Sequence, residues 1–279
     1  MLRVGDSALG TDLARYREQF REEGYFVLER VIPDEVVQML REECAYFVGY
    51  MDGKMDALGR ATIDINHRGS RYFISKLYRA SPRLPGFLFG ALMAAVVAAA
   101  LGPDAYLFNE QWVVKAAGTG MQFAWHQDSG YIEYEDQAAG HQPYLTCWCA
   151  LDDVSEENGA VYLLPHTRAG TRNTVLQHVR QGGTNDLVGY HGEEPGIAMT
   201  APAGSIVCFS SHVLHRSGAN RTSQTRRVYL AQYSSHPITA GDGTLWAMAV
   251  PFLRQGRIVH DRAADTAERF GPLPRGAAQ

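Results

Sequence analysis

The chain has 279 residues, of which 46% are hydrophobic and 20% are charged, and its formal net charge is −4 at pH 7. This balance is typical of a globular protein and excludes a collagen, a coiled coil and a largely disordered chain. A slight excess of acidic residues does not attract a polyanion, so we expect no nucleic-acid partner.

The longest apolar run, Phe87 to Leu101, is shorter than the roughly 20 residues that span a bilayer. The first residues lack the apolar segment of a signal peptide. We therefore expect no membrane contact and a cytoplasmic protein. The four cysteines do not suggest a disulfide framework, and Cys147 and Cys149 alternate with Trp148 like residues of a strand.

The first third of the chain, about residues 1–102, is predicted to be mostly helical. A charged helix over Asp12 to Glu23 ends at Gly24, and the sequence YFVLERVI then forms a short strand. Apolar residues at a 3.6-residue period predict a second helix over residues 35–51. Phe87 to Leu101 reads as one buried helix.

After Pro103 the pattern changes to short alternating or apolar runs separated by Gly, Asn, Asp and Pro. Such runs predict a β-sandwich or jelly roll over about residues 103–238, followed by a C-terminal extension over about 239–279. No repeat or linker divides the chain. We therefore expect one domain over residues 1–279, of α+β class and mainly β, with the N-terminal helices packed on one sheet.

The first chemical signal is the sequence WHQDSG. On a strand, His126 and Asp128 point to the same side and Gln127 to the other. An imidazole beside a carboxylate supplies two of the three ligands of the 2-His-1-carboxylate triad, which binds Fe(II) and leaves coordination positions open.

The third ligand has two candidates in the sequence SSHVLHRSGAN. On a regular strand, His212 and His215 face opposite sides, and His215 shares its side with the mostly apolar set Val207, Phe209 and Val213. His215 also lies just before a turn, where a barrel would open. We therefore predict His215 as the ligand and His212 as a packed or surface residue.

Arg226 follows His215 by 11 residues, on the strand that returns antiparallel after the turn. It shares a face with Val228 and Leu230, whereas Arg227 lies on the other face. A guanidinium enclosed near an iron site calls for a carboxylate partner, and the distal carboxylate of 2-oxoglutarate fits that requirement.

Residues 17 to about 235 resemble the phytanoyl-CoA dioxygenase family of Fe(II)/2-oxoglutarate oxygenases. The resemblance is carried by REEGYFVLERVI, WHQD, TCWCALDDVSEENGAVYLLP, AGSIVCF, and HRSGAN followed by Arg226. One departure is Pro165-His166-Thr167-Arg168, where the family often has Pro-Gly-Ser-His; no role is assigned to His166.

The resemblance implies a double-stranded β-helix, a cupin-like jelly roll, with iron at its open end. It places the metal ligands at His126, Asp128 and His215. The residues that it implies for binding 2-oxoglutarate are Arg226, Trp148, Ser217 and Gln111, with Asn109 as the alternative to Gln111.

The implied activity is hydroxylation, or another oxidation, of a small molecule, coupled to conversion of 2-oxoglutarate and O2 into succinate and CO2. Fe(II) is the implied cofactor, with ascorbate as a stimulant. Halogenating relatives have a small residue where this chain has Asp128, which favours oxygenation here.

The segment from Ser129 to Tyr144 is expected to cover the mouth of the barrel. Substrate-lining candidates are Tyr131, Glu133 and His141 in this segment, and Lys115 for an anionic substrate. Two other functions stay open at this point: a jelly roll that binds a ligand without catalysis, and a zinc enzyme that does not use a 2-oxo acid.

Overall fold

The computed structural model describes residues 13–118, 122–182 and 186–265. Its helices are α1 (Leu13–Glu23), α2 (Asp34–Ala57), the 3-10 turn η3 (Tyr78–Ala80), α3 (Leu84–Leu88), α4 (Ala91–Leu101), α5 (Asp128–Glu135) and α6 (His166–Ala169). Its strands are β1 (Tyr25–Leu28), β2 (Thr62–Ile63), β3 (Asn66–His67), β4 (Arg71–Ser75), β5 (Ala105–Lys115), β6 (Phe123–His126), β7 (Leu145–Ala150), β8 (Val161–Leu164), β9 (Val179–Arg180), β10 (Leu187–Val188), β11 (Ile197–Ala198), β12 (Ile206–Ser210), β13 (Leu214–Ser217), β14 (Arg226–Ser234), β15 (Val250–Arg254) and β16 (Arg257–Ile258).

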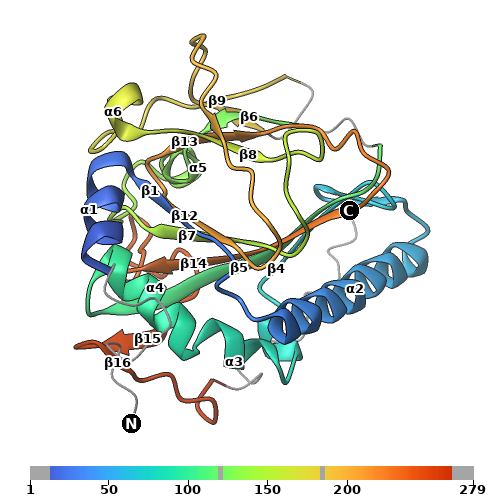
Figure 1. Cartoon of the computed structure of the whole chain (residues 1–279), viewed down its shortest axis with the longest axis horizontal. Helices are drawn as coiled ribbons and strands as arrows, with labels where there is room; N and C mark the ends of the chain where they lie inside the picture. The colour runs from blue at the N-terminus through green and yellow to red at the C-terminus, as the bar shows by residue number, and fades with distance from the viewer. Residues whose placement is uncertain (1–12, 119–121, 183–185, 266–279) are drawn as a thin grey trace.

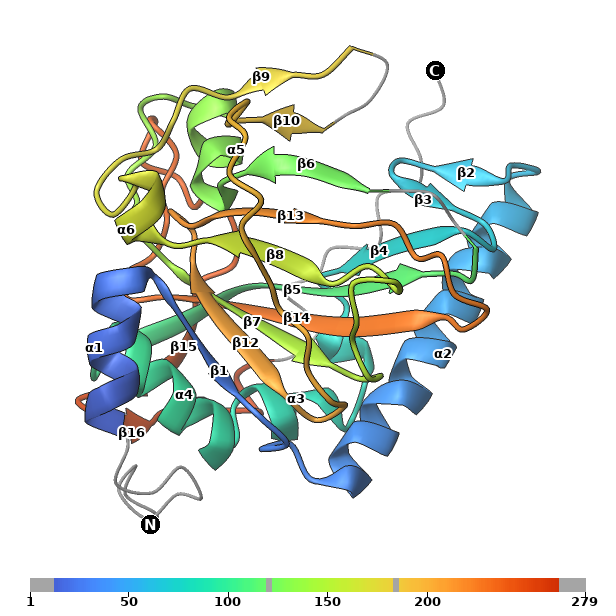
Figure 2. The same ribbon diagram turned by 45° about the horizontal axis from the view of Figure 1, so that its top comes forward.

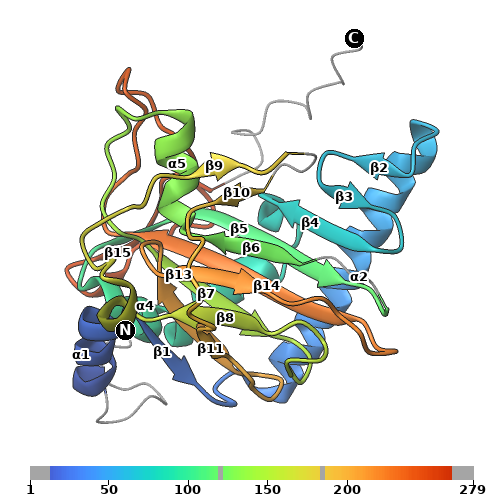
Figure 3. The same cartoon turned by 90° about the horizontal axis from the view of Figure 1, so that it is seen from above.

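Two antiparallel sheets face each other, as the jelly-roll prediction requires. The large sheet runs in the order β1-β12-β7-β14-β5-β4-β3-β2, with β15 and β16 attached beside β5. The small sheet runs in the order β11-β8-β13-β6 and lies over it (Figures 2 and 3). The strands β1, β12, β7, β14 and β5 of the large sheet and all neighbours in the small sheet are paired with strands distant in sequence, whereas β2, β3 and β4, and β15 with β16, pair as consecutive hairpins at the edge of the large sheet.

The helices α2, α3 and α4 cover the outer face of the large sheet (Figures 1 and 2), which confirms the predicted mainly β, α+β arrangement. Strand alternation explains the division of the two faces. Trp112 and Tyr229 are cross-strand partners that point outward, where their rings stack at 4.0 Å and Phe47 of α2 packs on Trp112. The next residues, Val113 and Val228, point inward to the second core cluster.

One prediction about the first third of the chain is wrong. The apolar run from Phe87 is not one helix, because the chain breaks between α3 and α4 at Gly90, where a Cβ atom would lie 2.5 Å from the carbonyl oxygen of Gly86. The described part of this region is otherwise mostly helical, as predicted, and β1 is the predicted short strand, whereas β2, β3 and β4 of the large sheet were not predicted. β2 and β3 have two residues each, too few for alternation to reveal them.

The predicted continuous strand before His215 is also divided. β12 ends at Ser210 in the large sheet and β13 begins at Leu214 in the small sheet, joined by a turn in which the Val213 amide donates to the Ser210 carbonyl. The chain therefore changes sheets between His212 and His215. His215 does not lie on the same strand as Phe209 and Val213, so the prediction that alternation along one strand puts the three side chains on one face is wrong.

Within the described part of the chain, no helix combines the length and the hydropathy that crossing a bilayer requires. The expected start of the first helix at Asp12 and the end of the C-terminal extension from residue 266 lie outside the described residues. The assignment of residues 1–279 to one domain stays a prediction.

Gly24 gives a stability test of the junction between α1 and β1. Its φ is +80°, and a Cβ atom would lie 2.4 Å from both His166 Nε2 and Val213 Cγ2. Gly24→Ala should lower the free energy of unfolding by about 3 kcal/mol, because backbone strain and overpacking add. Denaturant unfolding measures the change.

Gly59→Ala is the matched control. Gly59 also has a positive φ, of +61°, but a Cβ atom there meets no atom within 4 Å. This substitution should lower the free energy of unfolding by only about 1 kcal/mol, the backbone part alone. Equal losses at the two glycines would contradict the close packing at Gly24.

Candidate active site

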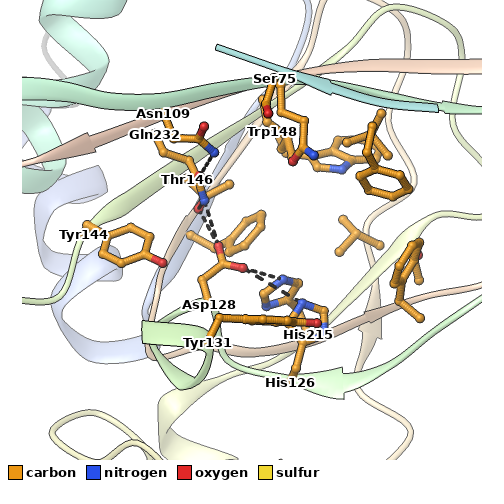
Figure 4. Close-up of a pocket in the computed structure, with 18 of the residues that line it drawn as sticks. Ser75, Asn109, His126, Asp128, Tyr131, Tyr144, Thr146, Trp148, His215 and Gln232 are labelled. Carbon is orange, nitrogen blue, oxygen red and sulfur yellow. Dashed lines mark hydrogen bonds and ion pairs between the residues drawn. The ribbon is translucent and has the colours of Figure 1, made fainter. Parts of the chain in front are cut away.

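A cavity of about 490 Å³ lies between the two sheets. Its walls come from the inner faces of β5, β7 and β14 in the large sheet and β6 and β13 in the small sheet, and α5 closes one side (Figure 4). All seven residues predicted to bind the metal or the cosubstrate line it: His126, Asp128, His215, Arg226, Trp148, Ser217 and Gln111.

The two predicted histidine ligands are direct partners across the small sheet. β6 pairs antiparallel with β13 in a register that sets His126 opposite His215, and their ring centroids lie 4.1 Å apart. Directly opposed residues on neighbouring strands place their side chains on the same face. The fold thus brings together two imidazoles that are 89 residues apart in the sequence.

Asp128 reaches the same point by a route that strand alternation did not foresee. β6 ends at His126, Gln127 precedes the first helical turn, and Asp128 is the first residue of α5. Its Oδ1 nevertheless lies 3.4 Å from His215 Nε2 and 3.9 Å from His126 Nε2. One ligand atom from each of the three residues falls within 4.8 Å of the others, which suits a single metal ion.

The hydrogen bonds of the two rings leave their Nε2 atoms available to a metal. His126 Nδ1 lies 2.8 Å from the Ala124 carbonyl and His215 Nδ1 lies 3.1 Å from the Val213 carbonyl. A carbonyl only accepts, so each Nδ1 carries the proton and each Nε2 presents a lone pair toward Asp128.

The charge states also suit a metal. Burial, and then the neighbouring His215, lower the pKa of His126, so this ring is neutral. Burial alone would raise the pKa of Asp128, but the two histidines and the Thr146 hydroxyl outweigh it and lower the pKa overall. Metal ligands must be neutral imidazoles and an ionised carboxylate, and the lowered pKa values of His126 and Asp128 agree with this requirement.

Two residues that the sequence analysis did not select hold the second oxygen of Asp128. Thr146 Oγ1 donates to Oδ2 at 2.9 Å and Gln232 Nε2 donates to it at 3.0 Å. Gln232 lies six residues after Arg226 on β14, on the same alternating face. That spacing was readable in the sequence, but the position of Asp128 opposite it was not.

At the other end of the cavity, three cations lie side by side on the inner face of the large sheet. Lys115 of β5 is the cross-strand partner of both Arg71 of β4 and Arg226 of β14. Like charges directly opposite one another on a sheet repel. Such a row suits a protein that receives an anion at this place.

Arg226 is the best placed of the three to bind an anion. Its side chain is 1% exposed, its guanidinium lies 5.4 Å from the centre of the Trp148 ring, and its Nη2 donates to the Gly159 carbonyl. Its Nε and Nη1 have no hydrogen-bond partner among the described residues. Burial lowers its pKa to about 10, so the group stays charged at neutral pH.

Lys115 is not where the sequence analysis placed it. It was a candidate for contact with an anionic substrate, but its ammonium is buried behind the cavity wall, where it donates to Ser217 Oγ at 2.8 Å and to the Gly218 carbonyl at 2.5 Å. Lys115 follows Val113, the last residue of β5 that lines the cavity. Its hydrogen bonds therefore stabilise the wall at the Arg226 end and do not reach the cavity itself.

The other substrate candidates separate into two groups. Tyr131 lines the cavity, and its ring meets His126 edge-on with centroids 5.4 Å apart. Glu133 and His141 do not line it, since the segment expected to be a covering loop forms α5 first and turns Glu133 to solvent. Ile132, Glu135 and Tyr144 of the same segment line the cavity instead.

The structure also places the residues that the sequence analysis weighed against His215, Arg226 and Gln111. His212 lies outside the cavity lining, with its Nδ1 3.2 Å from the Arg172 carbonyl. Arg227 forms a two-pronged ion pair with Asp152 rather than a solvated charge. Asn109 and Gln111 both line the cavity.

Lys115 gives a pH-dependent prediction for the protein without metal or 2-oxoglutarate. Burial, and then Arg226 and Arg71, lower its pKa from 10.5 to about 6. Between these values the unfolded chain binds the proton and the folded chain does not, so stability rises with pH. Relative to Lys115→Met, the unmodified protein should gain about 1 kcal/mol in free energy of unfolding per pH unit between pH 7 and 9.

Guanidinium unfolding of both proteins at several pH values measures this difference. Subtracting the Lys115→Met curve removes the titration of the groups that the two proteins share, among them Asp186, whose negative charge raises the pKa of Lys115. Parallel curves would show that Lys115 keeps an ordinary pKa.

Comparison with protein families identifies the family of the chain. The family described as "Phytanoyl-CoA dioxygenase (PhyH)" matches residues 20–228, about three quarters of the chain. This span contains His126, Asp128, His215 and Arg226.

Named relatives and solved structures agree with this match. An ectoine dioxygenase of Bordetella parapertussis is 26% identical over 233 residues, which cover 78% of this chain and 74% of that protein. The human peroxisomal phytanoyl-CoA dioxygenase is 22% identical, with coverage of 78% and 67%. The structure of EvdO2 from Micromonospora carbonacea in complex with 2-oxoglutarate shares the fold, with a TM-score of 0.62, 23% identity and coverage of 83% and 96%.

The match to the family covers most of the jelly roll, and the cavity presents a His-Asp-His cluster at one end and an unpaired guanidinium at the other. The chain belongs to the phytanoyl-CoA dioxygenase family and is an Fe(II)/2-oxoglutarate-dependent dioxygenase.

Proposed function

We propose that His126, Asp128 and His215 hold the iron and that Arg226 binds the distal carboxylate of 2-oxoglutarate, with Trp148, Ser217 and Gln111 around the cosubstrate. The observation that carries this proposal is the pairing, in one cavity, of a three-ligand cluster with a buried arginine whose Nε and Nη1 have no hydrogen-bond partner among the described residues. A zinc site or a simple binding module has no need of that arginine.

Each residue has a defined task in this arrangement. Arg226 neutralises and orients the dicarboxylate, and the Trp148 face restricts its position. Apolar walls from β5, β7 and β14 exclude bulk water. When bound, iron with 2-oxoglutarate and O2 supplies the oxidising chemistry, which yields succinate and CO2.

The reaction on the substrate is hydroxylation or a related oxidation of a small molecule. Asp128 supplies a carboxylate where a halide would otherwise bind, and Thr146 and Gln232 hold that carboxylate in place. The cavity volume of about 490 Å³ suits a small-molecule substrate. Ascorbate should sustain turnover by keeping iron reduced.

A reducing compartment, the cytoplasm, fits the cysteines. Cys44, Cys147, Cys149 and Cys208 are all free thiols buried in the protein. A protein exported to an oxidising compartment more often pairs its cysteines.

The metal assignment predicts a contrast among histidine variants. His126→Ala and His215→Ala should each lose most bound Fe(II) and all succinate formation, because two ligands do not hold the ion. His212→Ala should keep both. Metal content by mass spectrometry and succinate release from 2-oxoglutarate measure the two effects, and product masses in chloride buffer should show added oxygen without added chlorine. Iron lost from His212→Ala but kept by His215→Ala would overturn the assignment.

The cosubstrate assignment predicts a contrast between neighbouring arginines. Arg226→Ala removes charged hydrogen bonds worth on the order of 1.5–3 kcal/mol, so the affinity for 2-oxoglutarate should fall by at least about tenfold. Arg227→Ala should change it little, because Arg227 is engaged with Asp152. Anaerobic titration of the visible absorption band of the Fe(II)–2-oxoglutarate complex gives both affinities. Equal affinities for Arg226→Ala and the unmodified protein would show that another residue binds the distal carboxylate.

A further inference from the structure

A row of three polar side chains leads away from the Asp128 carboxylate across the large sheet. Gln232 of β14 is the cross-strand partner of Thr146 on β7 and of Asn109 on β5. Gln232 Nε2 donates to Asp128 Oδ2 and to Thr146 Oγ1, both at 3.0 Å, and Asn109 Nδ2 donates to Gln232 Oε1 at 2.7 Å (Figure 4).

The carboxylate determines which way both amides point. An ionised carboxylate only accepts hydrogen bonds, so Gln232 must turn its NH2 group toward Asp128 and its carbonyl oxygen away. Thr146 has one proton, which it donates to Asp128, so it too can only accept from Gln232. Asn109 must then offer its own NH2 group to Gln232 and keep its carbonyl oxygen for something else.

The carbonyl oxygen of Asn109 has no partner in the described structure. Oδ1 is enclosed and accepts no hydrogen bond there. Of the described residues with such a buried atom, Asn109 and Arg226 are the two that line the cavity. An enclosed acceptor left unpaired is unfavourable by about as much as a lost hydrogen bond. The unpartnered nitrogens of Arg226 suit a bound anion. By the same reasoning, the unpartnered oxygen of Asn109 suits a ligand that donates a hydrogen bond.

The cavity around Asn109 is mainly apolar and aromatic. Four large apolar side chains of the third core cluster line the cavity, namely Phe108, Ile132, Tyr144 and Trp246, and Glu135 of α5 adds a carboxylate to the lining. A ligand placed there contacts rings and aliphatic groups on most sides. The amide oxygen is therefore a specific polar feature in an apolar wall.

We infer that Asn109 is a specificity-determining residue, and that the substrate is a mainly apolar small molecule with a hydroxyl or N–H group that donates to Asn109 Oδ1. This inference rests on the proposed function, because it assumes that the substrate enters the cavity beside the iron. A molecule of the same shape with only an acceptor at that position would meet the oxygen of Asn109 without a proton between them, and would bind more weakly.

The test uses three matched pairs of probes that differ only as alcohol and ketone: cyclohexanol and cyclohexanone, 2-indanol and 2-indanone, and 1-phenylethanol and acetophenone. The protein is loaded with Mn(II) and 2-oxoglutarate, which prevents turnover. Electron paramagnetic resonance first confirms metal binding. Relaxation of the probe proton NMR signals by Mn(II) then gives the Kd of each probe near the metal. At least one alcohol should bind about tenfold more tightly than its ketone.

Three variants separate the amide from other causes. Asn109→Leu has nearly the same shape without the acceptor, so the alcohol-to-ketone ratio should fall to about one. Asn109→Asp keeps an acceptor oxygen but loses the N–H group that donates to Gln232 Oε1; where Mn(II) binding is retained, it should keep the preference for the alcohol. Ser75→Ala is the control in the same wall; a hydroxyl both donates and accepts, so its loss should leave the ratio unchanged.

The outcomes are distinguishable. Failure of the unmodified protein to bind Mn(II) with 2-oxoglutarate would contradict the proposed function. Normal metal binding with no alcohol preferred over its ketone, or with no probe bound at millimolar concentration, would overturn the role of Asn109 alone. So would a ratio that Asn109→Leu leaves unchanged while Mn(II) binding is retained.

Discussion

The antiparallel pairing of β6 with β13 is the constraint on which the active site depends. It sets His126 directly opposite His215, and after an irregularity between His215 and Ser217 it sets Phe123 opposite Ser217. Side chains on a strand alternate between faces, so a slip of one residue would turn one imidazole out of the cavity. The apolar partners of β13 on β8, Leu163 and Leu164, are fully buried and oppose such a slip.

The large sheet supplies the second half of the site by placing charge where hydrophobic residues would be more stable. Arg226 is charged and nearly inaccessible to solvent, and among the described residues no carboxylate forms a hydrogen bond with its guanidinium. Its neighbour Lys115 is equally buried, and this burial lowers the pKa of Lys115 to about 6. Buried charges without such partners destabilise a protein. A bound dicarboxylate would offset this penalty, so binding of the cosubstrate and stability of the fold are coupled at this end of the cavity.

The two oxygens of Asp128 connect metal binding to substrate recognition. Oδ1 faces the histidines, and Oδ2 accepts from Thr146 and Gln232 on neighbouring strands. Holding Oδ2 in this way favours a carboxylate that offers one oxygen to a metal and leaves other coordination positions open. The same hydrogen bonds orient Gln232 and, through it, Asn109. Asp128, a proposed metal ligand, thereby determines whether Asn109 presents an acceptor or a donor in the cavity wall.

The sequence alone predicted a β-sandwich or jelly roll from its short strands and turn residues, and the inward face of Arg226 from alternation, because these are local properties of the chain. It selected His126, Asp128 and His215 through their residue types and the family resemblance, since Asp128 begins a helix and His215 follows a change of sheet. Tertiary structure decided the rest. The change of sheet between Ser210 and Leu214, the start of α5 at Asp128 and the exclusion of Glu133 and His141 from the cavity depend on which strands pair. Gln232 and Thr146 can hold Asp128 only because β7 and β14 pair beside it. Pairing between segments that are distant in sequence is set by packing of the whole core and not by any local pattern.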